Sequence, residues 1–311
     1  DVPVDIARRK NDATLILEAS GTDADDASVS ARAEMVAHKG PIYYGITTED
    51  YVATAGGQTK ALLVTVDTQG KPVPDTETQV VLTRREWFTT QTEDAAGNRE
   101  YDSVPRDTPV LTRTVRTGTD GKASVSIDVA AGGEYRLVAS AVAPGGPRGA
   151  AFLYVSSRGG AYVTWRVNNN DRIDVKADKA AYKVGDTAMT LVPSPFSGTV
   201  TAPVTLERAP IRSSRIVTLK TNSDIIEVPV DASMAPNAYV SVMIVKGIDE
   251  RGGLPGYRLG YASFKVDPGA FALTIDIKPD RTNYRPRDPV TYDIRVTDVN
   301  GRPVQAELSL A

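Results

Sequence analysis

The sequence predicts an all-β protein made of tandem antiparallel β-sandwich domains. Apolar and polar residues alternate along many short segments, turn-forming residues separate these segments, and short patterns recur along the chain. The clearest alternation runs over residues 122–129, where Ala123, Val125, Ile127 and Val129 fall on one face. A period of two is what a half-buried strand requires. Many short strands divided by turns are typical of sandwiches of the immunoglobulin or fibronectin type III kind.

Further segments support the same fold class. The alternation recurs over residues 272–277 and 292–297. Residues 135–139 and 238–245 are more continuously apolar, so we expect them to form central strands. Pairs of turn-forming residues lie between the segments. These pairs are Gln69-Gly70, Asp120-Gly121, Gly132-Gly133, Gly252-Gly253 and Asn300-Gly301.

Two sequence patterns repeat near the expected starts of domains. The first pattern places an Asp, a Tyr and a Gly-Asp pair over residues 178–186, and residues 280–288 match it with Arg in place of Gly. A weaker copy covers residues 47–56, with its tyrosine at Tyr51. The second pattern, Asp-x-x-Gly-x-Pro-Val, suits a hairpin turn after which a strand restarts at a proline that needs no N–H. It occurs over residues 67–73 and 298–304.

A closing pattern divides the chain into domains. A small residue and then an aromatic residue or Met lead to a glycine at Gly40, Gly159 and Gly269, with Met35, Tyr154 and Phe264 as the larger residues. Each interval fits one immunoglobulin-sized sandwich. The predicted domains are the C-terminal strands of one domain at 1–40, a complete domain with a polar insertion (89–109) at 41–159, a complete domain at 160–269, and the N-terminal strands of a further domain at 270–311.

Composition excludes several classes of function. The net charge of −3 argues against a nucleic-acid partner, which would need a concentrated basic surface. The chain has no cysteine and a single histidine, so thiolate chemistry is absent. We therefore predict no catalytic residue, no cofactor and no metal site. No signal peptide, lipidation motif or membrane span is apparent, so no membrane contact by this chain is expected, and an Asp at residue 1 suggests a piece of a longer protein.

Candidate polar sites have simpler structural interpretations. His38 lacks a cysteine or a second histidine to work with, so a surface or edge position is favoured over a catalytic one. Asp23, Asp25 and Asp26 lack the ligand spacing of a calcium loop, and a solvated hairpin tip is favoured. The basic run over residues 8–10 is interpreted as a solvated face.

The polar insertion at residues 89–109 has two interpretations. It has no apolar periodicity, and Arg99 and Arg106 would make it a protease-exposed segment with trypsin-type sites. The favoured alternative is a pair of strands that extend beyond the core as a surface hairpin, joined by a turn at Gly97 and Asn98. Such a hairpin is expected to make few buried contacts.

Four aromatic residues could form platforms for stacking sugars. They are Trp87, Phe88, Tyr162 and Trp165. Tyr162 and Trp165 follow an expected domain boundary, where aromatic side chains also seal contacts between domains. Packing in a core or an interface is the favoured interpretation, because burying aromatic area is the commonest use of such side chains.

Some segments resemble the macroglobulin-like domains of the α2-macroglobulin family, and most closely those of its bacterial branch. The resemblance rests on the two repeated patterns and on several specific stretches. Those stretches include Ser194, Pro195, Phe196 and Gly198, residues 204–208, 217–219 and 226–230, Ala235, Pro236, Asn237, Ala238 and Tyr239, and Arg84, Arg85, Glu86 and Trp87.

This resemblance implies a function for the parent protein. Family members entrap proteases: a target protease cuts a bait segment, the domains collapse, and a thioester formed by a cysteine and a glutamine links the inhibitor to its attacker. Because this chain lacks cysteine, the resemblance implies a scaffold without the thioester, with the bait region expected after residue 311. The expected partners are target proteases, through the full-length parent, and neighbouring macroglobulin-like domains. The resemblance implies a periplasmic or extracytoplasmic location, and the bacterial members of the family are often tethered by lipid to the inner membrane.

Two other functions fit a chain of β-repeats. A surface adhesin or carbohydrate-binding stalk of immunoglobulin-like repeats explains the strands equally well, but not the specific stretches around Phe196 and Tyr239 together. An accessory module of a polysaccharide-degrading enzyme would need a row of exposed aromatic residues, for which an aromatic content of 6% leaves little room.

Overall fold

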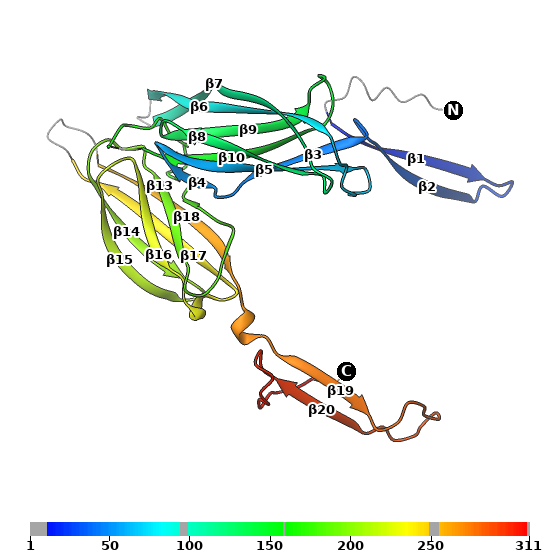
Figure 1. The fold of residues 1–311 in the computed structure, drawn as a ribbon. Helices are drawn as coiled ribbons and strands as arrows, with labels where there is room; N and C mark the ends of the chain where they lie inside the picture. Colours follow the sequence, from blue (N-terminus) through cyan, green and yellow to red (C-terminus); the bar gives the residue numbers. More distant parts are fainter. Residues whose placement is uncertain (1–10, 94–98, 158, 249–254, 310–311) are drawn as a thin grey trace.

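The computed structural model describes residues 11–93, 99–157, 159–248 and 255–309, and it confirms the all-β fold class (Figure 1). The described residues form strands β1 to β20 and two three-residue 3-10 turns, η1 (Ala232–Met234) and η2 (Gly269–Phe271). Two sandwiches stand at the centre, with one separate two-stranded hairpin toward each end of the chain.

The first sandwich packs a three-stranded sheet, in the order β3-β5-β8, against a five-stranded sheet, in the order β4-β10-β9-β6-β7. Its core contains the buried alternate residues that the pattern over 122–129 predicted, including Val125, Ile127 and Val129. Its strands are β3 (Ile42–Thr48), β4 (Val52–Thr54), β5 (Gly57–Asp67), β6 (Glu77–Glu93), β7 (Arg99–Arg116), β8 (Lys122–Val129), β9 (Gly133–Ala141) and β10 (Arg148–Ser156).

The second sandwich repeats this plan strand for strand, with sheets β11-β13-β16 and β12-β18-β17-β14-β15. Strands β11 to β18 thus correspond in order to β3 to β10. Its strands are β11 (Lys176–Ala177), β12 (Ala181–Tyr182), β13 (Thr187–Pro193), β14 (Val200–Glu207), β15 (Ile211–Leu219), β16 (Ser223–Pro229), β17 (Asn237–Lys246) and β18 (Gly256–Val266).

The sheets are mostly, but not wholly, antiparallel. In each sandwich the short second strand runs parallel to the last one, β4 beside β10 and β12 beside β18. The expectation of purely antiparallel sandwiches is therefore wrong at these edges. A parallel edge strand needs the chain to cross from one sheet to the other, which it does through the repeated opening pattern.

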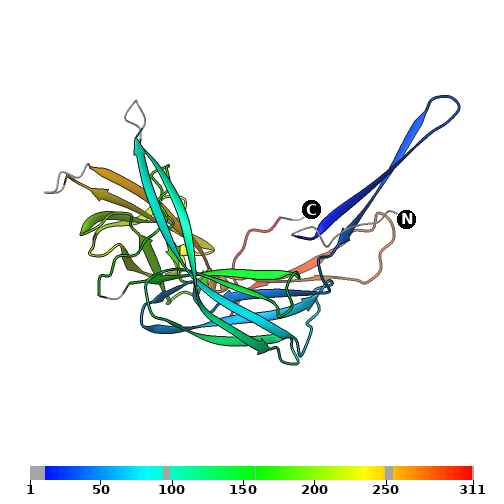
Figure 2. The ribbon, with the colours of Figure 1, turned by 90° about the horizontal axis from the view of Figure 1, so that it is seen from above.

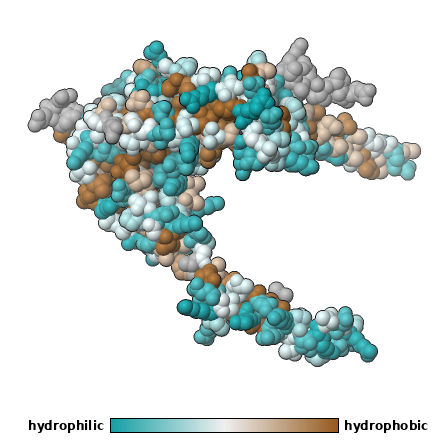
Figure 3. Space-filling view, in the orientation of Figure 1, coloured by the Kyte–Doolittle hydropathy of each residue, from teal (hydrophilic) through white to brown (hydrophobic). Residues whose placement is uncertain are grey.

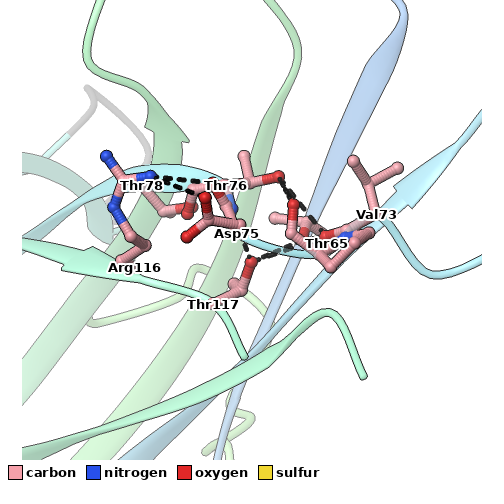
Figure 4. A network of polar contacts seen from close by, with 8 residues as sticks. Thr65, Val73, Asp75, Thr76, Thr78, Arg116 and Thr117 are labelled. Carbon is pink, nitrogen blue, oxygen red and sulfur yellow. Dashed lines mark hydrogen bonds and ion pairs between the residues drawn. The ribbon is translucent and has the colours of Figure 1, made fainter. Parts of the chain in front are cut away.

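Buried threonines close one end of the first sandwich (Figure 4). Thr65 Oγ1 donates to the carbonyl of Val73 at 2.7 Å and lies 3.2 Å from the hydroxyl of Thr117. Thr117 Oγ1 also accepts from the N–H of Thr76 at 3.0 Å, and Arg116 bonds the carbonyl of Asp75 at 3.2 Å. These bonds satisfy polar groups that would otherwise be costly to bury.

The opening pattern is a hydrogen-bonded clasp. The Asp178 carboxylate accepts from the Tyr182 hydroxyl at 2.7 Å and from the Met189 N–H at 2.7 Å, and the Lys179 N–H donates to that hydroxyl. The ring of Tyr182 is buried against Phe264, with centroids 4.9 Å apart. The corresponding bonds join Asp280, Tyr284 and the N–H of Thr291.

The weaker copy of this pattern aligns differently from the sequence-based expectation. The N–H of Glu49 donates to the carbonyl of Lys60 at 2.9 Å. In the same way, the N–H of Asp178 donates to the carbonyl of Met189, and the N–H of Asp280 donates to the carbonyl of Thr291. Glu49 is thus the counterpart of Asp178, and Ala53, not Tyr51, takes the place of Tyr182. The larger residues of the closing pattern also differ, because Tyr154 points away from the core while Phe264 lies within it.

The glycine of the opening pattern has a conformational role. Gly56 (φ 81°) and Gly185 (φ 95°) share a left-handed conformation, which Arg287 (φ 73°) adopts in the third copy. A side chain at Gly185 would meet no atom within 4 Å, so only backbone strain opposes it. We expect Gly185→Ala to lower the free energy of unfolding by about 1 kcal/mol in urea titrations.

The matched control for this prediction is Gly247→Ala. Gly247 also has open space around it and lacks the left-handed φ. It should change stability by less than about 0.5 kcal/mol. Equal effects of the two substitutions would contradict the assigned role of the left-handed conformation.

The two terminal hairpins are isolated two-stranded sheets. β1 (Ala13–Thr22) pairs with β2 (Ser28–Ala37), and β19 (Thr274–Pro279) pairs with β20 (Tyr292–Thr297), both antiparallel. Asp298, directly after β20, makes the same turn contacts as Asp67, the last residue of β5, so the second repeated pattern is one turn used twice. Figure 2 shows β1–β2 projecting away from the sandwiches.

Candidate functional site

The junction between the two sandwiches combines a buried apolar cluster with hydrogen bonds and charge contacts. An apolar cluster of Val52, Val163, Trp165 and Leu191 joins the outer face of the first sandwich to the outer face of β13 in the second. Tyr154 and Ile225 pack against this cluster. Leu191 lies between Thr190 and Val192, which face the opposite way into their own sandwich. The apolar area removed from water favours a fixed arrangement of the two sandwiches.

Asn222 ties the connecting segment to the second sandwich. Its side-chain amide accepts from the N–H of Val163 at 3.1 Å and donates to the carbonyl of Val163 at 2.7 Å. Its own carbonyl accepts from the indole Nε1 of Trp165 at 2.8 Å. Asn222 is buried, so its amide imitates a strand neighbour for an irregular segment whose polar groups would otherwise be unsatisfied.

Polar contacts surround the apolar cluster. The N–H of Tyr51 donates to the carbonyl of Asp178 at 2.6 Å, and Lys179 Nζ lies 4.0 Å from the carboxylate of Asp50. The ammonium group of Lys176 lies 5.0 Å from the ring centroid of Tyr154. Burial is the main cause that raises the pKa of Tyr154 to about 12, so this ring keeps its hydroxyl proton.

A second polar contact holds the two sandwiches together near Ser157. The N–H of Ser157 donates to the hydroxyl of Ser223 at 2.9 Å, and the two hydroxyls lie 2.8 Å apart. Ser223 is buried at the start of β16. The first sandwich therefore touches the second at both β13 and β16.

The polar insertion forms the extended hairpin predicted as the favoured alternative. β6 and β7 pair antiparallel from Glu77 and Arg116 to Glu93 and Arg99, with a register shift between Leu82 and Thr83. The expected turn at residues 97–98 and the basic run at 8–10 lie outside the described residues. Arg106 is exposed on β7. Figure 2 shows this hairpin rising beside the second sandwich.

The described residues 89–93 and 100–109 of this hairpin include no buried residue, in agreement with the expectation of few buried contacts, but the hairpin is hydrogen-bonded to the connecting segment. Ser103 Oγ donates to the carbonyl of Val167 at 2.9 Å and accepts from its N–H at 3.3 Å. The N–H of Trp87 bonds the carbonyl of Thr164 at 3.4 Å. The hairpin thus lies against the connecting segment, whose backbone accepts a hydrogen bond from the otherwise unpaired edge of β6.

Arg258 links the hairpin to the second sandwich. Its guanidinium lies 5.8 Å from the ring centroid of Tyr101 and 5.6 Å from that of Phe196, and Nη1 donates to Asp171 at 2.7 Å. Arg258 is buried although it carries a charge. From its place in β18, Arg258 thus contacts the hairpin, the connecting segment and the turn between β13 and β14.

A bidentate ion pair braces the hairpin itself. Arg85 donates from Nε and Nη2 to the Asp107 carboxylate at 2.7 and 2.8 Å. This hydrogen bond is the main cause that lowers the pKa of Asp107, and it is also the main cause that raises the pKa of Arg85. A carboxylate with a lowered folded-state pKa stabilises the fold above its unfolded pKa, and the effect is lost as the pH falls through its folded value.

We therefore expect wild type to be more stable than Asp107→Asn at neutral pH. The difference should shrink as the pH falls from about 5 to about 3, across the usual carboxyl range. Urea titrations of both proteins at each pH measure it, with Asp128→Asn as an exposed control. A difference that stays constant with pH would contradict the assigned ion pair.

The structure places the other predicted residues at the surface or in the junction. His38 follows β2, and its Nδ1 lies 2.6 Å from the Tyr43 hydroxyl, which bonds Asp12. Asp23 caps the β1–β2 turn by accepting from the N–H groups of Asp25 and Ala27, as a hairpin tip should.

The four candidate aromatic residues differ in their surroundings. Trp165 is buried in the junction, and Trp87 donates to Glu134 at 3.0 Å beneath Arg166. Tyr162 and Phe88 are exposed, so only Trp165 seals the junction as expected. Asn222 and Arg258 were not predicted, because their roles depend on partners far away in sequence.

Within the described ranges, no group of three or more His, Cys, Asp or Glu side chains could hold a metal ion. No helix of the described residues is long and apolar enough to cross a membrane. The junction itself offers interlocked apolar packing and charge pairs.

Comparison with known proteins identifies both sandwiches. Residues 45–153 match the family model "Bacterial macroglobulin domain 6", and residues 173–311 match "Alpha-2-macroglobulin bait region domain". A domain named for the bait region thus lies over residues 173–311, and the expectation that the bait segment itself follows residue 311 stays a prediction.

Curated relatives agree with the family models. An alpha-2-macroglobulin homolog of Nostoc is 28% identical over 64% of this chain and 11% of its own length. Alpha-2-macroglobulin of Escherichia coli is 24% identical over 84% of this chain and 16% of its own length. The chain thus spans less than a fifth of either relative.

A solved structure also resembles the chain. The native conformation of E. coli alpha-2-macroglobulin matches 95% of this chain and 19% of its own chain, with 21% identity and a TM-score of 0.38. The family models and curated relatives carry the assignment, and the chain belongs to the bacterial α2-macroglobulin family.

Proposed function

We propose that this chain is a structural scaffold of an endopeptidase inhibitor that entraps proteases. Members of the α2-macroglobulin family are protease inhibitors rather than enzymes. The observation that carries the proposal is the interlocked junction. It joins a macroglobulin domain to a domain whose family is named for the bait region. A fixed junction lets a change in one domain displace the other as a rigid body.

The proposed role of this chain is mechanical. It carries no cysteine, so a thioester of the cysteine-glutamine kind would have to come from another part of the parent. Its partners are target proteases, engaged through the full-length parent, and the adjoining macroglobulin-like domains. The proposed location of the parent is the periplasm, tethered by lipid to the inner membrane.

Inhibition assays test this function. The full-length parent, incubated with trypsin or elastase, should block cleavage of a large protein substrate while leaving cleavage of a small peptide substrate largely intact, because entrapment excludes by size. The isolated chain should change neither activity. An unhindered large-substrate reaction with the parent would overturn the proposal, as would protease inhibition or peptide cleavage by the chain alone. Cell fractionation of the parent tests the periplasmic location separately.

A further inference from the structure

The repeated hydrogen bonds allow the two joints of the chain to be compared residue by residue. The first joint connects the two sandwiches, and the second connects the second sandwich to β19–β20. Glu49, Asp178 and Asp280 make the same backbone bond and are counterparts. The N–H of Tyr154 donates to the carbonyl of Tyr51 at 2.9 Å, and the N–H of Lys265 donates to the carbonyl of Ala180. Lys265 is therefore the counterpart of Tyr154.

The first joint depends on three kinds of contact. Asp50 faces Lys179 with opposite charge. The ring of Tyr154 receives the ammonium group of Lys176. Val52 and Leu191 belong to the buried apolar cluster.

None of these contacts is available at the second joint. Where the first joint has Asp50 and Lys179, the second joint has Lys179 and Arg281, which carry like charges. Lys265 and Lys278 stand at the second joint where Tyr154 and Lys176 stand at the first, and both are cationic. Lys278 corresponds to Lys176 because it pairs across its sheet with Asp293, as Lys176 pairs with Leu191.

The apolar pair is lost as well. The counterparts of Val52 and Leu191 are Ala181 and Asp293. Docking in the geometry of the first joint would therefore bury a carboxylate where the first joint buries a leucine, and a buried charge without a partner opposes docking. Arg281 and Lys278 have carboxylate neighbours in their own hairpin, which reduce the repulsion without replacing the apolar contact.

The arrangement of the chain agrees with this comparison. Within the described ranges, the hydrogen bonds and ion pairs of residues 274–309 all have partners in that same segment. Figures 1 and 3 show β19–β20 joined to the second sandwich only through the narrow neck around η2.

We propose that residues 267–273 form a hinge and that the residues on its two sides prevent the docked arrangement seen at the first joint. The chain thus has one fixed joint followed by one movable joint. The hinge lies inside the stretch that matches the bait region domain. This inference rests on the repeat and its charges, and it does not depend on the proposed inhibitor function.

Distance measurements on the intact chain test the hinge. The chain has no native cysteine, so spin labels go only where cysteines are introduced. Ser126→Cys with Ser213→Cys spans the first joint, and Ser213→Cys with Thr282→Cys spans the second; all three positions are exposed. Double electron–electron resonance should give a narrow distance distribution across the first joint and a distribution at least twice as wide across the second. A narrow distribution across the second joint would overturn the hinge.

Designed variants test its cause. Arg281→Asp, Lys265→Tyr and Asp293→Leu together restore the ion pair, the aromatic ring beside a lysine and the leucine of the first joint, and they should narrow the second distribution. Arg285→Asp, an exposed charge reversal outside the joint, should leave it wide. In the opposite direction, Asp50→Lys with Tyr154→Lys should widen the first distribution, whereas Glu49→Lys should not. A second distribution unchanged by the triple variant, or a first distribution unchanged by the double variant, would overturn the assignment to these residues.

Discussion

Replacing Trp165 by alanine is expected to lower the free energy of unfolding by about 3–5 kcal/mol, the usual cost of removing a large buried aromatic side chain. Trp165 is buried between the two sandwiches, and its indole N–H bonds the carbonyl of Asn222. Its loss leaves a cavity in the apolar cluster and removes one of the two hydrogen bonds of the Asn222 carbonyl, which also accepts from the N–H of Ser194 at 3.0 Å. Urea titration monitored by circular dichroism measures the loss.

The same substitution should separate the unfolding of the two sandwiches, because the junction is what couples them. Calorimetry should then resolve two transitions in place of one. Tyr162→Ala is the control, since Tyr162 lies three residues earlier in the same segment and its ring is exposed. A loss below about 1 kcal/mol for Trp165→Ala, or equal losses for the two variants, would show that Trp165 does not hold the junction.

Removing the Tyr182 side chain is expected to have the second largest effect, a loss of about 3–4 kcal/mol for Tyr182→Ala. The ring is buried against Phe264, and its hydroxyl bonds Asp178. Tyr182→Phe keeps the ring and removes only the hydroxyl, so it should cost about 1 kcal/mol. Urea titration of the second sandwich measures both variants.

Tyr284 provides the matched comparison for this prediction. It makes the same hydroxyl bond to Asp280, but the surrounding residues of β19 are exposed. Tyr284→Ala should therefore leave the unfolding of the second sandwich unchanged. If Tyr182→Ala costs less than about 0.5 kcal/mol, as surface substitutions usually do, the clasp does not stabilise the domain.

The strands could be predicted because apolar and polar residues alternate along each one according to which side chains face the core. Val125, Ile127 and Val129 fill the core of the first sandwich as the pattern over residues 122–129 requires. The extension of β6 and β7 was also foreseeable, since a polar segment without apolar period cannot enter a core. These features depend on neighbours within a few residues.

Features that depend on register could not be predicted as well. Tyr51 matched the opening pattern by residue type, but the hydrogen bonds of Glu49 place Ala53 at the tyrosine position. A shift of this size is invisible in a single sequence, because the period of two fits equally well after a displacement of two residues. The closing pattern paired Tyr154 with Phe264 although the two residues are one position apart in the structural register. A displacement of one residue exchanges the two faces of a strand, so one ring points away from the core and the other into it.

The junction was only partly foreseeable. Trp165 beside an expected domain boundary indicated an interface, and it is buried there. Asn222 gave no signal, because an asparagine in a turn usually serves the turn itself. Its amide instead holds Val163, a residue far earlier in the chain. Arg258 is similar, since its contacts to Tyr101 and Asp171 exist only once the hairpin has packed.

The central claim is that the connecting segment locks the two sandwiches into one body, and hydrogen exchange measured by NMR tests it most directly. The backbone N–H of Val163 and the indole N–H of Trp165 both bond Asn222 inside the junction. If the junction is fixed, both should exchange as slowly as core amides such as that of Val240, because they open only when the fold opens. Exchange of either group at the rate of an unstructured peptide would contradict the claim.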